Sequence, residues 1–229
     1  MTLSERIRSD IETRIKSGDW RPGHRIPFEH ALVATYGCSR ATVSKALEAL
    51  AKAGLIERRR KAGSFVAHPH VQSAVLEVPD LPHLIAALGE VYRWQLNSVR
   101  ELDAEPQSET GIAGPVLEIE GIHHGGGEQF ALEHRLIALA TVPGARDAAF
   151  TDVPPGTWLL AHVPWTEARH RIKAIDPTRA EAALLGLTAR AACLQIERWT
   201  WQAGEAVTYV RQVFPGHRYD LVAEFKPGR

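Results

Sequence analysis

The sequence predicts an α+β protein in two domains: a small helical head that ends in a β-hairpin, and a larger body built on an antiparallel sheet. Three observations lead to this prediction. Apolar residues recur at helical spacing through the first fifty residues, whereas strand-like alternation dominates from residue 91 onward. The chain has 229 residues, which suits one small domain and one of about 150 residues.

Charge divides the chain near the same place. Residues 1–67 contain 13 Lys or Arg and 7 Asp or Glu, whereas the remaining residues contain 14 and 20. We therefore expect a basic head at 1–69, a linker at 70–76 and an acidic body at 77–229. Binding to a phosphate backbone requires such a local basic face, although a run of charges is usually only a solvated surface.

Two helices are predicted at the start of the head. Within residues 3–17, Ile7, Ile11 and Ile15 recur at every fourth position and predict one buried stripe. A Pro-Gly turn follows, because both residue types break helices. A second, short helix is predicted at 28–36.

The third helix is the element around which the head is organised. Ser39 can cap it, because its hydroxyl can accept a free amide hydrogen bond in the first turn. Arg40, Ser44 and Lys45 lie off its apolar stripe and near its N-terminus, where recognition helices meet the major groove of DNA. An ordinary amphipathic surface helix is the alternative interpretation. The stripe consists of Val43, Ala46, Leu47, Leu50 and Ala51.

A basic hairpin completes the head. Residues 55–60 and 64–67 are predicted strands around a turn at 61–63, and Arg58, Arg59, Arg60 and Lys61 gather at its tip. Three helices followed by such a hairpin make a winged helix-turn-helix. Arginines at the tip of a wing beside that motif favour contact with DNA.

Residues 4–67 resemble the DNA-binding domain of the GntR family of bacterial transcription regulators. The resemblance extends over the whole domain in ordered spacing: 18–27, Glu29, 39–43, Ala46-Leu47, 54–56 and 63–66. The chain departs from the family at Phe28, where Ser is usual, and at His30, Ser44 and Lys61. These departures leave DNA binding possible, but the operator sequence can differ from the family norm.

The resemblance implies a homodimer on a palindromic, double-stranded DNA operator, because a two-fold operator requires two heads. Arg25 and Lys61 are the candidates for phosphate contact. The full set of DNA-contact candidates is Arg25, His30, Ser39, Arg40, Thr42, Ser44, Lys45, Arg60, Lys61 and Gly63.

Strands dominate the predicted body. They are expected at 91–99, 115–123, 128–138, 165–175, 193–202, 206–214 and 219–225. Short helices are expected at 80–88, 103–112, 143–150, 157–162 and 177–185, with Pro177 in the first turn of the last. Adjacent hairpins imply an antiparallel sheet flanked by these helices.

The body resembles the UTRA effector-binding domain of the HutC branch of the family, whose fold is similar to chorismate lyase. The residues that carry this resemblance are 133–135, 166–170, 175–187, 197–201, 207–211 and 215–219. The branch implies a repressor of histidine-utilisation genes with urocanate as its small-molecule effector. The effector-binding candidates are Glu133, Arg135, His170, Tyr209, Arg211 and Tyr219.

Urocanate is a flat imidazole acrylate with one carboxylate, so it needs a cationic fork and polar partners for its ring nitrogens. Arg135 and Arg211 are the carboxylate candidates, because a buried Arg requires an anion. Glu133 lies two residues from Arg135, so both face one side of a strand, where Glu133 can pair with Arg135 or accept an imidazole hydrogen bond. A structural salt bridge or a satisfied core polar group is the alternative for each. Asp80, near the start of the body, disfavours a phosphosugar by repulsion.

Several classes of protein are disfavoured. Two cysteines, Cys38 and Cys193, make no disulfide framework and fit a reducing cytoplasm. The amphipathic N-terminus is no signal peptide, and no apolar run is long enough to span a membrane. We expect no cofactor and no metal, since His68 and His70 lack a third ligand nearby.

Three functions remain open. The first is a cytoplasmic, ligand-responsive repressor. The second is an enzyme of the chorismate-lyase type, although a DNA-binding head has no role in that chemistry. The third is a regulator of the same architecture that senses another small carboxylate, a phosphonate or a sugar.

Overall fold

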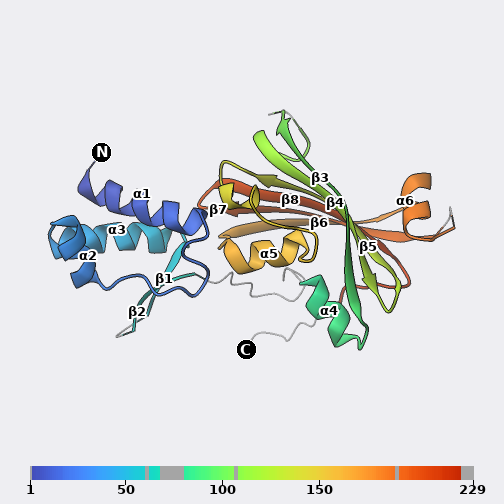
Figure 1. The fold of residues 1–229 in the computed structure, drawn as a ribbon, viewed down its shortest axis with the longest axis horizontal. Helices are drawn as coiled ribbons and strands as arrows, with labels where there is room; N and C mark the ends of the chain where they lie inside the picture. Colours follow the sequence, from blue (N-terminus) through green and yellow to red (C-terminus); the bar gives the residue numbers. More distant parts are fainter. Residues whose placement is uncertain (1, 60–61, 68–79, 106–107, 189–190, 223–229) are drawn as a thin grey trace, which may run out of the picture.

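The computed structural model describes residues 2–59, 62–67, 80–105, 108–188 and 191–222, in which a helical head adjoins a body built on a sheet (Figure 1). The helices of the head are α1 (Leu3–Lys16), α2 (Glu29–Tyr36) and α3 (Arg40–Lys52). Antiparallel strands β1 (Ile56–Arg59) and β2 (Gly63–Val66) form the wing. The predicted winged helix-turn-helix is confirmed.

One apolar core holds the head together. Ile7, Ile11 and Ile15 of α1 are at most 1% exposed and pack with the buried stripe of α3. Ser39 caps α3 as predicted, since its side chain accepts a hydrogen bond from the Thr42 amide. The periodicity that predicted these helices is thus the periodicity of their buried faces.

The body contains a six-stranded antiparallel sheet in the order β3-β4-β5-β8-β7-β6. Its strands are β3 (Tyr92–Ala104), β4 (Gly114–Gly125), β5 (Glu128–Ala138), β6 (Glu167–Ile175), β7 (Cys193–Gln202) and β8 (Glu205–Pro215). The other elements are α4 (Leu81–Ala87), the 3-10 turn η1 (Pro143–Ala145), α5 (Pro155–His162) and α6 (Arg179–Leu184). The α+β class is confirmed.

The two faces of the sheet carry separate apolar clusters. We call the face of the sheet that α5 covers the inner face (Figure 1). It carries a cluster that includes Trp94, Ile119 and Leu159. The Trp94 indole donates a hydrogen bond to the Phe150 carbonyl. The outer face carries a different cluster that includes Trp199 and Tyr209. Consecutive residues of a strand therefore pack into different clusters, one on each face of the sheet.

Two predicted elements are wrong where they can be compared. The helix expected at 103–112 does not form, because β3 continues to Ala104 in register with β4 and only turns follow it in the described residues. The strand expected at 219–225 is absent at 219–222, where the Tyr219 ring stacks on Phe214, and its last residues lie outside the described ones. In both cases tertiary pairing overrides local preference.

Smaller corrections concern the helices. The helix expected at 143–150 shrinks to the three residues of η1, because Phe150 turns inward and is 3% exposed. Thr178 caps α6 together with Glu181, so Pro177 precedes that helix. The helix expected at 80–88 ends one residue early, and Leu88, which follows α4, is 59% exposed.

The head contacts the body just beyond the end of α5. A β-carbon built on Gly54, in the turn after α3, would lie 3.0 Å from the Cγ2 atom of Thr166. Gly54 also has φ +71°, a left-handed conformation that favours glycine at the end of a helix. This turn therefore has two reasons to contain glycine, one local and one at the contact between head and body.

Candidate functional site

A groove in the head runs between α2, the start of α3 and the wing. It is lined by Pro27, Phe28, Glu29, His30, Val33, Arg40, Leu47, Arg58, Arg59, Gly63 and Ser64. Three predicted DNA contacts, His30, Arg40 and Gly63, thus lie on one surface. The groove is the candidate DNA interface.

Glu29 ties the recognition helix to the wing. Its Oε2 atom accepts a hydrogen bond from Arg40 Nε at 2.9 Å, and its Oε1 atom accepts one from Arg58 Nη2 at 2.7 Å. The Glu29 side chain is 22% exposed, whereas that of Arg40 is 84% exposed. One half-buried carboxylate therefore orients two arginines that face solvent. In the sequence analysis Glu29 was named only as part of the family pattern, and no role was predicted for it.

Arg25 anchors the wing. Its Nη2 atom donates to the Ala62 carbonyl at 2.9 Å, and its guanidinium lies 4.1 Å from the centroid of the Phe28 ring. The Phe28 ring also stacks on His30, with centroids 5.6 Å apart. Phe28, a departure from the family pattern, thus packs against two of the predicted DNA contacts.

The remaining DNA-contact candidates differ in accessibility. The hydroxyls of Ser39 and Thr42 lie 2.9 Å apart in the first turn of α3, where they also serve the cap. Ser44 is half-buried and Lys45 is exposed. Arg60 and Lys61 lie outside the described residues.

The body contains a pocket between the inner face of the sheet and α5. About 560 Å³ of space is free of atoms there, a figure that includes the open mouth of the pocket. Its lining residues are Asp80, Leu81, Pro82, His123, Glu133, Arg135, Pro154, Gly156, Thr157, Leu159, Leu160, Val163, Trp165, Arg198, Thr200, Val207, Thr208 and Gln212. Of the six predicted effector contacts, only Glu133 and Arg135 line it.

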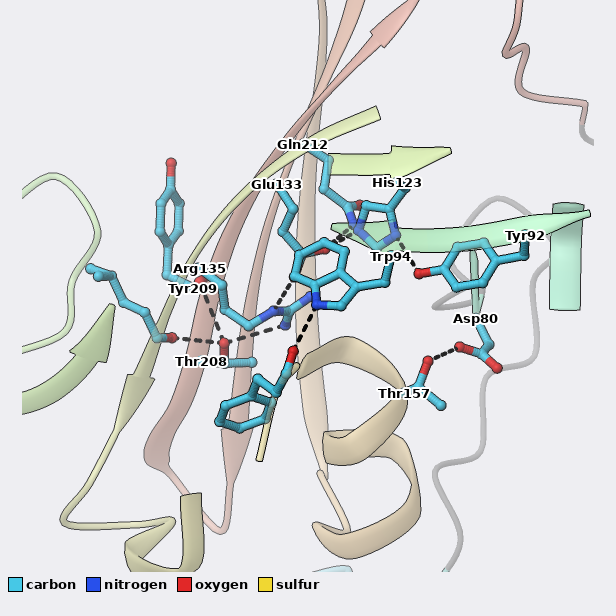
Figure 2. Close-up of polar contacts among 12 residues, drawn as sticks. Asp80, Tyr92, Trp94, His123, Glu133, Arg135, Thr157, Thr208, Tyr209 and Gln212 are labelled. Atoms are coloured by element: carbon cyan, nitrogen blue, oxygen red, sulfur yellow. Dashed lines mark hydrogen bonds and ion pairs between the residues drawn. The ribbon is translucent and has the colours of Figure 1, made fainter. Parts of the chain in front are cut away.

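Glu133 is the centre of a buried polar network (Figure 2). Its carboxylate accepts hydrogen bonds from Arg135 Nε at 2.7 Å, Gln212 Nε2 at 2.6 Å and His123 Nε2 at 3.1 Å. The other ring nitrogen of His123 lies 2.9 Å from the Tyr92 hydroxyl. Of the two alternatives given for Glu133, pairing with Arg135 or accepting a hydrogen bond from the imidazole of an effector, the structure shows the pairing with Arg135.

The network keeps Glu133 ionised. Burial opposes its charge, but the Arg135 guanidinium and the hydrogen bonds from His123 and Arg135 outweigh this and hold the pKa of the Glu133 carboxyl well below its ordinary value. Burial, followed by the charge of Glu133, raises the pKa of Tyr92, so this phenol remains protonated and can donate a hydrogen bond.

Arg198 is a second buried cation in the pocket. It is 4% exposed, and its Nε atom donates to His170 Nε2 at 2.6 Å. Burial, followed by the charge of Arg135, lowers the pKa of Arg198 to about 10, so it is still protonated at neutral pH. No carboxylate of the described residues forms an ion pair with it. Buried charges are normally paired, so this guanidinium is available to an anion from outside the chain.

The sheet register explains how the two arginines meet. Arg135 of β5 and Arg198 of β7 both lie opposite Val210 of β8, one from each side. Side chains in one row across a sheet point to the same face, so both guanidiniums reach the pocket side. Because β8 lies between them, β5 and β7 are roughly 10 Å apart.

Three of the other predicted effector contacts, Tyr209, Arg211 and Tyr219, have partners outside the pocket lining. On the outer face, the Tyr209 hydroxyl donates to Glu197 at 3.0 Å, and Arg211 forms an ion pair with Glu181 at 2.6 Å. Tyr219 stacks on Phe214, with ring centroids 4.2 Å apart. His170 reaches the site only through Arg198.

Several polar lining residues escaped the sequence reasoning. Thr208 and Gln212 lie four residues apart on one strand, so alternation places both on one face. Arg198 lies within residues 197–201, which resemble the UTRA domain, but it was not among the predicted effector contacts. The face on which its side chain lies depends on the strand register, which the sequence alone does not reveal. The missed polar lining residues are His123, Thr157, Arg198, Thr200, Thr208 and Gln212. Asp80 was considered only as a charge that repels phosphate, and it also lines the pocket.

Two other features are absent from the described ranges. No group of three or more His, Cys, Asp or Glu side chains there is placed to hold a metal ion. In the same ranges, no helix combines the length and apolar character needed to cross a membrane.

Comparison with family models identifies both parts of the chain. Residues 3–66 match the model of "Bacterial regulatory proteins, gntR family", and residues 87–220 match that of the "UTRA domain". The second match alone covers more than half of the chain.

Relatives of similar length agree. The histidine utilization repressor of Klebsiella aerogenes is 34% identical over 225 residues, which cover 96% of this chain and 93% of that protein. The protein of the same name from Pseudomonas aeruginosa is 35% identical over 229 residues, with coverages of 97% and 91%.

Solved structures share the fold. The C-terminal domain of the histidine utilization repressor from Pseudomonas syringae matches with a TM-score of 0.54 and 25% identity, and covers 59% of this chain and 99% of that one. PhnF from Mycobacterium smegmatis matches with a TM-score of 0.59 and 24% identity, with coverages of 97% and 100%. At that identity PhnF supports the fold alone.

We predict that Glu29→Gln lowers affinity for a specific operator more than affinity for random DNA. The substitution releases Arg40 and Arg58 from their shared carboxylate, so both lose their fixed orientation. Gel-shift titration against an operator selected from a random DNA library, and against random duplex, measures the ratio.

Glu48→Gln is the matched control, because it also removes one negative charge from the head but breaks only an exposed pair with Lys52. Equal specificity ratios in the two variants would contradict the positioning role of Glu29.

We further predict that His170 makes stability depend on pH between about 7 and 5. Burial, followed by the charge of Arg198, lowers the pKa of His170 from 6.5 to about 4. The unfolded state therefore binds the proton first, so stability is fully present above pH 6.5 and falls as the pH drops toward 4. Chemical denaturation should show a smaller loss over pH 7 to 5 in His170→Gln than in the wild type. His217→Gln, at an exposed position, should behave as the wild type does.

Proposed function

Because this chain belongs to the GntR family of bacterial regulatory proteins and carries a UTRA domain, we propose that it represses histidine-utilisation genes and is induced by urocanate. The family assignment makes it a DNA-binding, ligand-responsive repressor and not an enzyme. Relatives named for histidine utilization support the choice of target genes. We also propose that the protein acts in the cytoplasm, where a bacterial repressor would bind its operator.

The observation that carries the effector assignment is the buried guanidinium of Arg198, which forms no ion pair with any acid in the described part of the chain. Glu133 already balances the charge of Arg135, so one buried positive charge remains on the sheet side of the pocket. A single carboxylate, as in urocanate, would neutralise it through charge-assisted hydrogen bonds. The apolar side chains of Leu159 and Val163 opposite the sheet suit a flat ring.

The pocket is less suited to a phosphosugar. A phosphate group brings up to two negative charges, and Asp80 adds another at the same pocket. Another small carboxylate, a phosphonate or a sugar remains the alternative effector. If the effector belongs to one of these classes, the proposal that the protein is a DNA-binding repressor still holds.

In the head, we propose that Arg40, Ser44 and Lys45 of α3 face the major groove, while Arg25 and the wing contact the phosphate backbone. The groove supports this arrangement, because Glu29 in its lining accepts hydrogen bonds from both Arg40 of α3 and Arg58 of the wing. We propose a homodimer whose two heads bind half-sites roughly 34 Å apart or a multiple of that. The limits 1–69, 70–76 and 77–229 remain our proposed domains, and both family matches lie within them.

We predict that Arg198→Ala abolishes the response to urocanate while operator affinity stays within about two-fold of the wild type. Truncating one partner of a buried charge pair typically costs about 2–5 kcal/mol, which is roughly 30-fold or more in affinity. Arg135→Ala should have the same effect on the response, provided that it folds. The thermal shift with urocanate measures binding, and gel shift with and without urocanate measures the response.

Arg211→Ala is the matched control, because its guanidinium pairs with Glu181 on the outer face. A wild-type protein that melts at the same temperature with and without urocanate, but responds to another acid, would remove the effector assignment. A variant Arg198→Ala that still responds normally would remove the pocket assignment.

A further inference from the structure

Asp80 precedes α4 in the position of a helix cap, but its side chain does not cap the helix. Aspartate is among the preferred capping residues, because its carboxylate can accept the free amides of the first turn. Here the carboxylate instead accepts a hydrogen bond from the Thr157 hydroxyl of α5, at 2.5 Å (Figure 2). The Asp80 side chain is thus directed toward α5 and the pocket that both residues line.

The second carboxylate oxygen of Asp80 is free to accept a hydrogen bond. Thr157 occupies Oδ1, and within the described parts of the chain no donor contacts Oδ2 and no cation pairs with Asp80. An ionised carboxylate has about four acceptor sites on its two oxygens. Asp80 can therefore take a donor from a ligand without losing its bond to Thr157.

Glu133, the other acid of the pocket, has no such capacity to spare. Three donors, from His123, Arg135 and Gln212, already occupy its two oxygens, and its side chain is 1% exposed. A ligand donor would have to displace one of these buried partners, which would leave a buried polar group unsatisfied. Of the two acids that line the pocket, Asp80 is therefore the one that can accept a hydrogen bond from a ligand nitrogen.

The pocket is consequently bipolar. Arg135 reaches it from β5 and Arg198 from β7, whereas Asp80 reaches it from the start of α4, beside α5. Figure 2 shows Arg135 with Thr208 on one side of the site and Asp80 with Thr157 on the other. The unpaired cation and the unpaired acid belong to different walls.

We propose that Asp80 determines effector specificity: it accepts an N–H from one end of a ligand whose carboxylate is held by Arg198 at the other end. The ligand class is a flat carboxylate with a nitrogen donor at its far end. This inference rests on the proposed function, because urocanate is a member of that class. It assigns the recognition of the ring nitrogen to α4 and not to the sheet.

The test compares two ligands that differ in the ring donor. Urocanate has an imidazole N–H, whereas 3-(2-furyl)acrylate has the same planar carboxylate on a ring without that donor. Calorimetric titration of the full chain gives the affinity ratio between them. The wild type should prefer urocanate by roughly 10-fold to 100-fold, the usual worth of a hydrogen bond to a charged group.

Asp80→Asn should reduce this ratio at least about 10-fold, mainly by weakening urocanate, because a neutral amide is a poorer acceptor. Asp152→Asn is the matched control, since it removes an exposed carboxylate just before α5 that does not line the pocket. The control should keep the wild-type ratio. Melting curves of the unliganded variants establish that both fold.

The outcomes separate the inference from the function on which it rests. A wild type that binds both acids equally, or a ratio unchanged in Asp80→Asn, overturns the role of Asp80 and leaves the repressor assignment standing. A wild type that binds neither acid overturns the effector assignment, and the role of Asp80 with it. The wild-type comparison alone decides the point if Asp80→Asn does not fold.

Discussion

The buried ion pair between Glu133 and Arg135 is the interaction on which the effector pocket depends. Removing one member of such a pair typically costs about 3–5 kcal/mol, because it strands the other charge away from water. The pair holds Arg135 on the same face of the sheet as Arg198. Burial, followed by repulsion from the charge of Arg135, lowers the pKa of Arg198. A carboxylate that enters the pocket relieves this repulsion. Part of the pocket's affinity for a carboxylate therefore comes from neutralising the positive charge of Arg198.

The body and the head are in contact through the segment that follows α5. Thr157 and Val163 line the pocket, and Thr166 lies against Gly54 in the turn after the recognition helix. Under the proposed function, a ligand that repositions this segment alters the support of α3. The resulting change in DNA affinity can be no larger than the ligand's preference for one arrangement over the other.

Local sequence patterns predicted the fold of the head and one of the two buried arginines of the pocket, Arg135. They did not predict the second, Arg198, or the pocket as a whole. The four-residue spacing of Ile7, Ile11 and Ile15 reports a buried face directly, and Glu133 and Arg135 share a face because they are two residues apart. Choosing between Arg198 and Arg211 requires the register of β7 against β8, which is a long-range property. For the same reason, a helix was expected where β3 pairs with β4.

A crystal structure of the full chain with urocanate tests the central claim most directly. The account predicts the carboxylate within hydrogen-bond distance of Arg198, the ring against α5, and a ring N–H on the free oxygen of Asp80. Urocanate bound outside this pocket, or on the outer face beside Arg211, would contradict the assignment of the effector site. Urocanate in the pocket with its carboxylate away from both arginines would contradict the electrostatic argument.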